Sequence, residues 1–176
     1  SRTSPWVQRY KWPIYFFVAV AFWNMVGAGL FGFMINPPIA LYYMQGLNTT
    51  PLHGHAALFG VYGMLGIGLM LVCLRVLIPG REWTDGLLRF SFWSLNGGLM
   101  TMCVLSLLPV GLLQTNASVQ HSYWYARSGE FMQSDLMQTL RWMRVPGDTV
   151  FFLGAVALVL FVAGLKAGYS FKTEKQ

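Results

Sequence analysis

The sequence predicts an all-α integral membrane protein with about four transmembrane helices. Of its 176 residues, 55% are hydrophobic and only 10% are charged, whereas a soluble domain carries about a quarter charged residues. The apolar residues gather into four blocks of the length, about 20 residues, that a helix needs to cross a bilayer. These blocks lack the alternation of a membrane β-barrel. The first block is also too long for a signal peptide, and no small-residue cleavage pattern follows it.

The first two predicted spans cover residues 13–35 and 51–77. Asn36-Pro37-Pro38 ends the first, because proline lacks an amide hydrogen and clashes with the preceding turn. Thr50 is the predicted cap of the second helix, with Pro51 at its first position, and Pro79-Gly80 ends it.

The other two predicted spans cover residues 90–113 and 149–169. Pro109 predicts a kink in the third helix, and Asp148, after Gly147, is a candidate cap for the fourth. The long loop between them, residues 114–147, carries apolar residues at helical spacing, which predict an amphipathic helix against the bundle or the membrane surface. These residues are Met132, Leu136, Leu140 and Met143.

Basic residues predict the orientation of the chain. Four helices place both ends on one side, together with Arg2, Arg9, Lys11, Arg75, Arg81, Arg89, Lys166, Lys172 and Lys175. The other side holds only Arg127, Arg141 and Arg144. The positive-inside rule then places both termini in the cytoplasm. Topology accounts for the net charge of +6, so nucleic-acid binding is not expected.

His53 and His55, at the start of the second helix, are the candidate metal ligands. Ionisable residues inside a membrane are costly and mark functional sites. Two residues two positions apart differ by about 200° around a helix, so these histidines cannot readily share one metal. Two haems, one on each side, suit this geometry, since imidazole is a good ligand for haem iron. The alternative is a pair of interfacial histidines held by hydrogen bonds.

The remaining polar and small residues in the spans favour structural interpretations. Cys73 and Cys103 show no metal-ligand spacing and are interpreted as packing residues. Asn24 and Asn96 predict hydrogen bonds between helices. His121 is expected to lie in a surface loop. Close helix packing is favoured over a cofactor contact for the glycines of the second helix, which are Gly60, Gly63, Gly66 and Gly68.

Several motifs in order resemble one family. Residues 53–64, HGHAALFGVYGM, are similar to the tenth helix of the catalytic subunit of bacterial nitric oxide reductases, within the haem-copper oxidase superfamily. Residues 22–33, the pair of segments 91–93 and 107–111, and residues 142–148 agree as well. The likeness covers nearly the whole chain and is closest to the quinol-dependent, single-subunit type. It implies that the chain is the C-terminal part of a haem-copper oxidase-like helical bundle.

The resemblance implies roles for the two histidines. His53 would be the proximal ligand of a high-spin haem b, which faces a non-haem iron, and His55 one axial ligand of a low-spin haem b. Both haems would lie toward the outer side. The reaction would be the reduction of two molecules of nitric oxide to nitrous oxide and water.

Three further residues are candidates near the same end. Arginine forms bidentate hydrogen bonds with carboxylates, and Arg144 and Arg141 are candidates to bind the haem propionates, with interfacial anchoring as the alternative. The resemblance also places Asp148 near a quinol pocket, where it would accept a proton or a hydrogen bond.

The chain departs from the family in its length. The other low-spin ligand and the histidines and glutamates of the non-haem iron site are absent, so the remaining helices of the catalytic subunit are required and the chain is not expected to be active alone. A start without methionine suggests a processed or truncated piece. Expected partners are those helices, quinol, nitric oxide and lipid, with a homodimer left open, in a bacterial inner membrane. The alternatives are a non-catalytic anchoring subunit and a b-type cytochrome-like protein.

Overall fold

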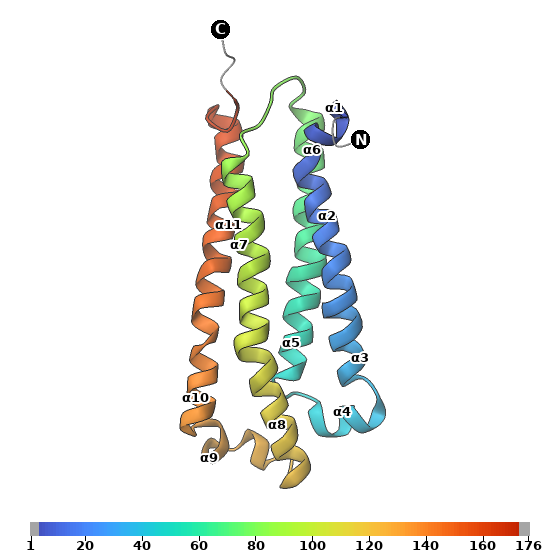
Figure 1. Cartoon of the computed structure of the whole chain (residues 1–176), viewed down its shortest axis with the longest axis vertical. Helices are drawn as coiled ribbons and strands as arrows, with labels where there is room; N and C mark the ends of the chain where they lie inside the picture. The colour runs from blue at the N-terminus through green and yellow to red at the C-terminus, as the bar shows by residue number, and fades with distance from the viewer. Residues whose placement is uncertain (1–3, 173–176) are drawn as a thin grey trace.

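Four long helical rods, joined at alternate ends, form the molecule in the computed structural model, which describes residues 4–172 (Figure 1). The rods are long and apolar enough to cross a membrane, and they span Lys11–Ile35, Thr49–Leu77, Gly86–Gln120 and Asp135–Ala167. Apart from one antiparallel bridge between Trp83 and Phe171, the described residues are helical or irregular. The predicted all-α integral membrane fold is confirmed.

The first two rods lie side by side, and each is interrupted by a π-helical stretch. The first comprises α2 (Lys11–Trp23), η1 (Asn24–Leu30) and α3 (Phe31–Ile35), and it ends at Asn36-Pro37 as predicted. The second comprises α5 (Thr49–His55), η2 (Ala56–Gly63) and α6 (Met64–Leu77). A short helix, α1 (Pro5–Arg9), precedes the first rod, and α4 (Pro38–Met44) connects the two.

The start of the second rod differs from the prediction. The helix begins at Thr49, and neither Asn48 nor Thr50 caps it with a side chain. Instead, the Thr50 hydroxyl accepts a hydrogen bond from the amide of Gly46 (3.1 Å), which has a φ of 71°. The turn at Gly46 therefore positions the start of this helix. The capping residues in the sequence did not indicate this turn.

The third rod is longer than predicted. It runs through α7 (Gly86–Met102), η3 (Cys103–Leu107) and α8 (Leu108–Gln120), so residues 114–120 are helical and do not belong to the loop. The π-helical stretch ends at Leu107, two residues before Pro109. A wider turn at this point accommodates the missing amide hydrogen of proline, and the helix continues beyond it.

The fourth rod begins earlier than predicted, with α10 (Asp135–Trp142) leading into α11 (Arg144–Ala167). Pro146 lies in the first turn of α11, where proline is tolerated, so Asp148 is inside the helix and its assignment as a cap is wrong. The predicted amphipathic helix forms as α10. Its buried side chain is Met137, however, whereas Leu136 is exposed, because α10 packs on α8 and η3 through another face.

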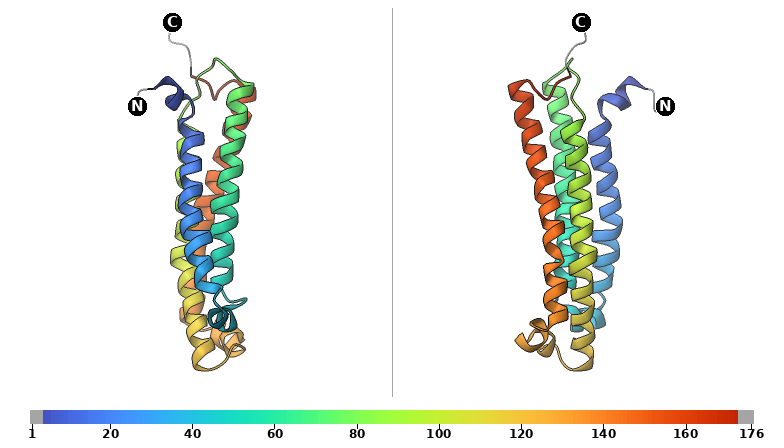
Figure 2. Two further views of the ribbon diagram at one scale, coloured as in Figure 1. Left: turned by 90° about the vertical axis from the view of Figure 1, so that its right-hand side faces the viewer. Right: turned by 60° about the vertical axis from the view of Figure 1, so that its left-hand side comes forward.

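The remaining loop segments are two short helices, η4 (Tyr125–Arg127) and α9 (Gly129–Met132), at the end opposite α1 (Figure 2). We call the end where α1 and residue 172 lie the terminal end.

The core lies between the rods and is built from aromatic and branched side chains. Trp12, Phe16 and Trp23 of the first rod pack against Leu71 of α6 and Phe92 of α7. Many large apolar side chains point outward, including Phe33, Leu77 and Trp93. Such an exposed apolar surface is typical of a chain surrounded by lipid or by further helices. Cys103 is buried, as a packing role requires, but Cys73 is exposed, so that interpretation is wrong for Cys73.

Candidate haem-ligand site

The candidate site occupies the first two turns of α5, at the end of the bundle opposite the terminal end. Gln114 of α8 fixes the entry to this helix, because its side-chain oxygen accepts hydrogen bonds from both the backbone and the side-chain nitrogen of Asn48 (2.9 and 2.7 Å). Gly111 allows α8 to approach Thr49 closely, since a Cβ atom there would lie 2.6 Å from the Thr49 nitrogen. The third rod therefore sets the position of α5 through two contacts from α8.

His53 faces the first rod. Its Nδ1 lies 2.9 Å from the carbonyl oxygen of Gly27 in η1. Its ring also lies beside Gly32, where a Cβ atom would come within 3.0 Å of Cε1. A carbonyl oxygen only accepts hydrogen bonds, so Nδ1 carries the hydrogen and, in the neutral ring, Nε2 keeps its lone pair.

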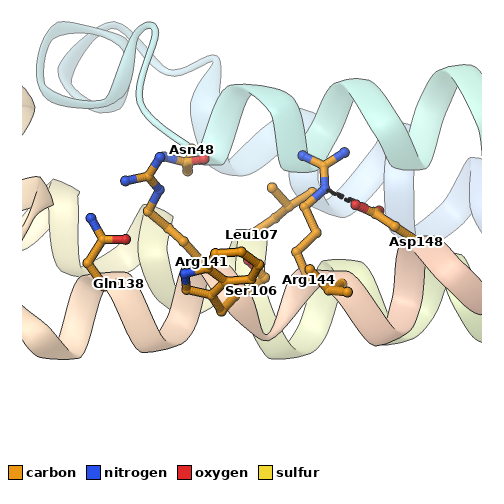
Figure 3. Close-up of a pocket in the computed structure, with 9 residues that line it drawn as sticks. Asn48, Ser106, Leu107, Gln138, Arg141, Arg144 and Asp148 are labelled. Atoms are coloured by element: carbon orange, nitrogen blue, oxygen red, sulfur yellow. Dashed lines mark hydrogen bonds and ion pairs between the residues drawn. The ribbon is translucent and has the colours of Figure 1, made fainter.

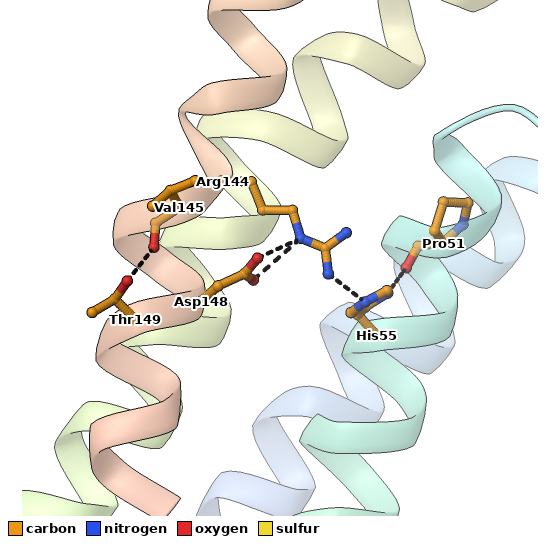
Figure 4. A network of polar contacts seen from close by, with 6 residues as sticks. All are labelled: Pro51, His55, Arg144, Val145, Asp148 and Thr149. Carbon is orange, nitrogen blue, oxygen red and sulfur yellow. Dashed lines mark hydrogen bonds and ion pairs between the residues drawn. The ribbon is translucent and has the colours of Figure 1, made fainter.

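His55 faces the fourth rod instead. Its Nδ1 lies 2.8 Å from the carbonyl oxygen of Pro51, one turn earlier in the same helix. Its Nε2 lies 3.0 Å from the terminal nitrogen of Arg144, which donates to it (Figure 4). The two histidines thus point toward different rods, as their spacing predicts, and both present Nε2 as the acceptor atom.

The fixed ring orientations suit haem ligation, but the ligand nitrogen of His55 is occupied by Arg144, which has to move away before iron can bind there. Metal-binding histidines typically donate their second ring hydrogen to a carbonyl or a carboxylate, which fixes the ring and makes the ligating nitrogen more basic. Both rings have such a carbonyl partner. Gly54, between them, adds no side chain, and a Cβ atom there would meet nothing within 4 Å. Residues 4–172 contain no group of three histidine, cysteine or acidic side chains that could together hold a metal ion.

Arg144 connects His55 to a carboxylate. Its Nε donates to both oxygens of Asp148, at 3.2 and 2.9 Å, one turn along α11 (Figure 4). A row of three groups therefore runs from the second rod to the fourth: imidazole, guanidinium and carboxylate. The ion pair between Arg144 and Asp148 is partly exposed. It therefore orients Arg144 more than it stabilises the fold.

Arg141 shares a pocket with this pair. The pocket has a volume of about 460 Å³, and Figure 3 shows Arg141 of α10 and Arg144 of α11 extending into it from the fourth rod. It is lined by Asn48, Ser106, Leu107, Gln138, Arg141, Trp142, Arg144, Val145 and Asp148. We call this the arginine pocket.

Three polar residues of this region were not singled out from the sequence. Asn48 and Ser106 line the arginine pocket, and Gln114 is buried beneath it. The position of Gln114, directly after an apolar block, is the sequence feature that could have indicated it. His121 lies exposed after α8 against the ring of Tyr125, in agreement with a surface role.

Comparison with known proteins places this chain in a family. The model of cytochrome c and quinol oxidase polypeptide I matches residues 4–150, and the chain belongs to this family of respiratory oxidases. Among its relatives is a nitric oxide reductase subunit of Stutzerimonas stutzeri, which is 28% identical over 142 residues. That match covers 74% of this chain but only 28% of the relative. The chain thus spans less than a third of the length of the protein it resembles.

Proposed function

We propose that this chain is the C-terminal part of a nitric oxide reductase catalytic subunit, in which His53 and His55 each supply one axial ligand to a separate haem b. The observation that supports the proposal is the geometry of the pair. Two imidazoles on one helix turn point toward different rods, each with Nδ1 on a carbonyl oxygen and Nε2 as the acceptor. One helix can therefore serve two cofactors.

The residues of this chain would hold and orient the cofactors. His53 would bind the high-spin haem, and His55 the low-spin haem. When bound, the haems supply electron transfer and a site for nitric oxide, so that two molecules of it, two protons and two electrons give nitrous oxide and water. When the low-spin haem binds, Arg144 would leave Nε2 of His55, and Arg144 and Arg141 would provide guanidinium groups for the haem propionates. Asp148 holds Arg144 in place.

The partners follow from what the chain lacks. The non-haem iron and the second low-spin ligand require residues outside this chain, in the remaining helices of the catalytic subunit. Quinol is the proposed electron donor, and Asp148, at the edge of the arginine pocket, offers a carboxylate to a quinol hydroxyl. The proposed location is a bacterial inner membrane, with both termini in the cytoplasm.

No observation favours the two alternatives. A b-type cytochrome that binds its haem within this chain needs histidines on two helices, whereas His53 and His55 share one and His121 is exposed. A non-catalytic anchor would not need two imidazoles that are each fixed by a hydrogen bond to a carbonyl oxygen. Haem content separates the cases, because an anchor purifies without haem.

The test replaces each histidine in the complete enzyme and records the optical and paramagnetic-resonance spectrum of each haem. His53→Ala should remove the high-spin signal and leave the low-spin bands, and His55→Ala should do the reverse. Turnover should fail in both. His121→Ala is the matched control and should keep both signals. Two intact haem signals in both variants would show that the histidines are structural, and exchanged losses would show that the two assignments are reversed.

A further inference from the structure

The two ends of the bundle differ in charge. Among residues 4–172, the terminal end carries seven basic side chains and only two acidic ones, Glu82 and Asp85, which leaves five positive charges. The opposite end carries three of each sign. The basic residues of the terminal end are Arg9, Lys11, Arg75, Arg81, Arg89, Lys166 and Lys172. This excess is consistent with a cytoplasmic location, but it does not explain how individual arginines are arranged.

The two acidic residues of this end already have cationic partners. Glu82 forms an ion pair with Lys172 at 2.8 Å, and that lysine holds the pKa of the Glu82 carboxyl below its usual value. Asp85 lies 3.7 Å from Lys11 and accepts a hydrogen bond from the indole of Trp12 (2.7 Å). Neither carboxylate forms an ion pair with an arginine, so the arginines of this end have no described acidic partner.

Two of these arginines stack on neighbouring aromatic rings. The loop between α6 and α7 arches toward the end of α11 (Figure 1), and the bridge between Trp83 and Phe171 joins the two segments. The guanidinium of Arg75 lies 3.6 Å from the centre of the Trp83 ring, and that of Arg81 lies 3.8 Å from the centre of the Phe171 ring. Stacking occupies the flat faces and leaves the edges, where the N–H groups are, for an anion.

Arg75 is unusual because it is buried. Only 7% of its surface is exposed, one terminal nitrogen donates to the carbonyl of Arg81 (3.2 Å), and its Nε has no partner. Asp85 and Glu82 are close enough to interact with this charge but form no ion pair with it, and a buried charge without a direct partner is costly. Trp83, on which it stacks, is also buried and has an unpartnered indole nitrogen. An anion beside Arg75 would compensate its buried charge, and the exposed guanidinium of Arg81 would be the first group that such an anion meets.

The position of the site indicates the source of the anion. Arg75 lies in the last turn of the second rod, and on the neighbouring face Val76 and, two turns deeper in the span, Leu69 are apolar and 65% and 51% exposed. A cationic site thus borders an apolar surface at the end of a membrane span. A phospholipid presents the same order of groups, a phosphate followed by acyl chains, whereas inorganic phosphate would leave the apolar surface uncovered.

We propose that Arg75 and Arg81 form a binding site for the phosphate of an anionic phospholipid in the leaflet at the terminal end, with its acyl chains along Val76 and Leu69. Basic pockets between membrane helices are known to take such head groups. Two stacked guanidinium edges provide charge-assisted donors to phosphate oxygens. This site is far from the histidines along the second rod and does not depend on the proposed reaction.

The experiment uses the complete membrane protein that contains this chain, purified in detergent and titrated with phosphatidylglycerol or phosphatidylcholine, with lipid binding followed by native mass spectrometry. Wild type should bind phosphatidylglycerol in preference to phosphatidylcholine. Arg81→Gln should weaken phosphatidylglycerol binding about tenfold or more, as loss of a charge-assisted hydrogen bond predicts. Arg81 is exposed in a loop, so the variant should fold. Arg75→Gln tests whether the buried arginine also contributes to phosphatidylglycerol binding.

Arg89→Gln is the matched control, because Arg89 is exposed at the same end and stacks on no ring in the described chain. It should leave phosphatidylglycerol binding nearly unchanged. Equal weakening by Arg81→Gln and Arg89→Gln would show that only the general charge of this end matters, and the proposal would be wrong. Equal binding of the two lipids would also overturn it. Displacement of phosphatidylglycerol by inorganic phosphate at millimolar concentration would show a phosphate site instead.

Discussion

Asn96 shows how one polar side chain can join two helices in an apolar surrounding. Its side-chain oxygen accepts a hydrogen bond from the indole nitrogen of Trp23 (2.9 Å), and its nitrogen donates to the carbonyl of Phe92 (2.8 Å). Trp23 is only 1% exposed, so no solvent replaces this partner. The prediction of a bond between helices is confirmed for Asn96. Asn24 is exposed on the bundle surface and makes no such bond within the described residues.

Replacing Asn96 by leucine should lower the stability of the protein. The buried Trp23 indole would lose its acceptor, at a cost of about 1 kcal/mol, as measured for hydrogen bonds between membrane helices. Thermal unfolding of the purified protein in detergent measures the effect. Thr101→Val is the control on the same helix, since the Thr101 hydroxyl donates only within its own helix, to Gly97. Equal melting temperatures for the two variants would contradict this role.

At the scale of helices, glycines set the distance between α7 and α11. A Cβ atom at Gly98 would lie 2.5 Å from the Phe151 nitrogen, and one at Gly147 would lie 2.6 Å from the Met102 nitrogen. Both obstructing atoms are backbone, which cannot move aside. This pair of helices also makes the most extensive contact in the bundle. Since α11 begins with Arg144, the spacing of the two helices sets how far that residue reaches toward His55.

Adding one methyl group should separate these two helices. Gly98→Ala forces α7 away from α11 and should destabilise the protein by about 1–3 kcal/mol, the usual cost of overpacking. It should also alter the low-spin haem spectrum of the complete enzyme through Arg144. Gly97→Ala, one residue away, meets nothing within 4 Å. It should be neutral or slightly stabilising, because alanine favours helix. A normal melting temperature for Gly98→Ala would refute the close contact.

The sequence predicted the helices better than their boundaries. Apolar blocks indicated four rods because length and hydrophobicity alone determine whether a helix can span a bilayer. The ends were less accurate. The third helix continues past Pro109 to Gln120, and the fourth begins at Arg144 instead of residue 149, because proline is tolerated in the first turn of α11.

The site shows the same division between what is local and what depends on packing. The spacing of His53 and His55 predicted their different directions, since it depends only on helix geometry. The partners of each ring could not be predicted, because Gly27 and Arg144 come from other rods. Of the glycines in the second helix, Gly60 and Gly68 have the expected close contacts, with Trp23 and Phe17, but Gly66 faces open space.

For the whole molecule, the charge difference between the ends predicts its orientation. The terminal end should face the cytoplasm, because basic residues are retained there. Single cysteines at Glu82 and Gln120, both exposed, test this after Cys73 and Cys103 are replaced by alanine. A membrane-impermeant thiol reagent added to spheroplasts should label the cysteine at position 120 and not the one at position 82. The opposite labelling pattern would reverse the assigned orientation.

The π-helical stretch η2 has a consequence for the tolerance of this chain to insertions and deletions. An extra residue in a wide turn changes the angular phase between the helix segments on either side of it. His53 and His55 precede this stretch, whereas Gly68 and Leu71, which pack against the first rod or the core, follow it. Deleting a single residue within 56–63 would rotate one segment against the other by about 100°. His53 would then turn away from Gly27 although every contact residue was still present. The number of residues between the histidines and the packed half of the helix is therefore as strict a requirement as their identity.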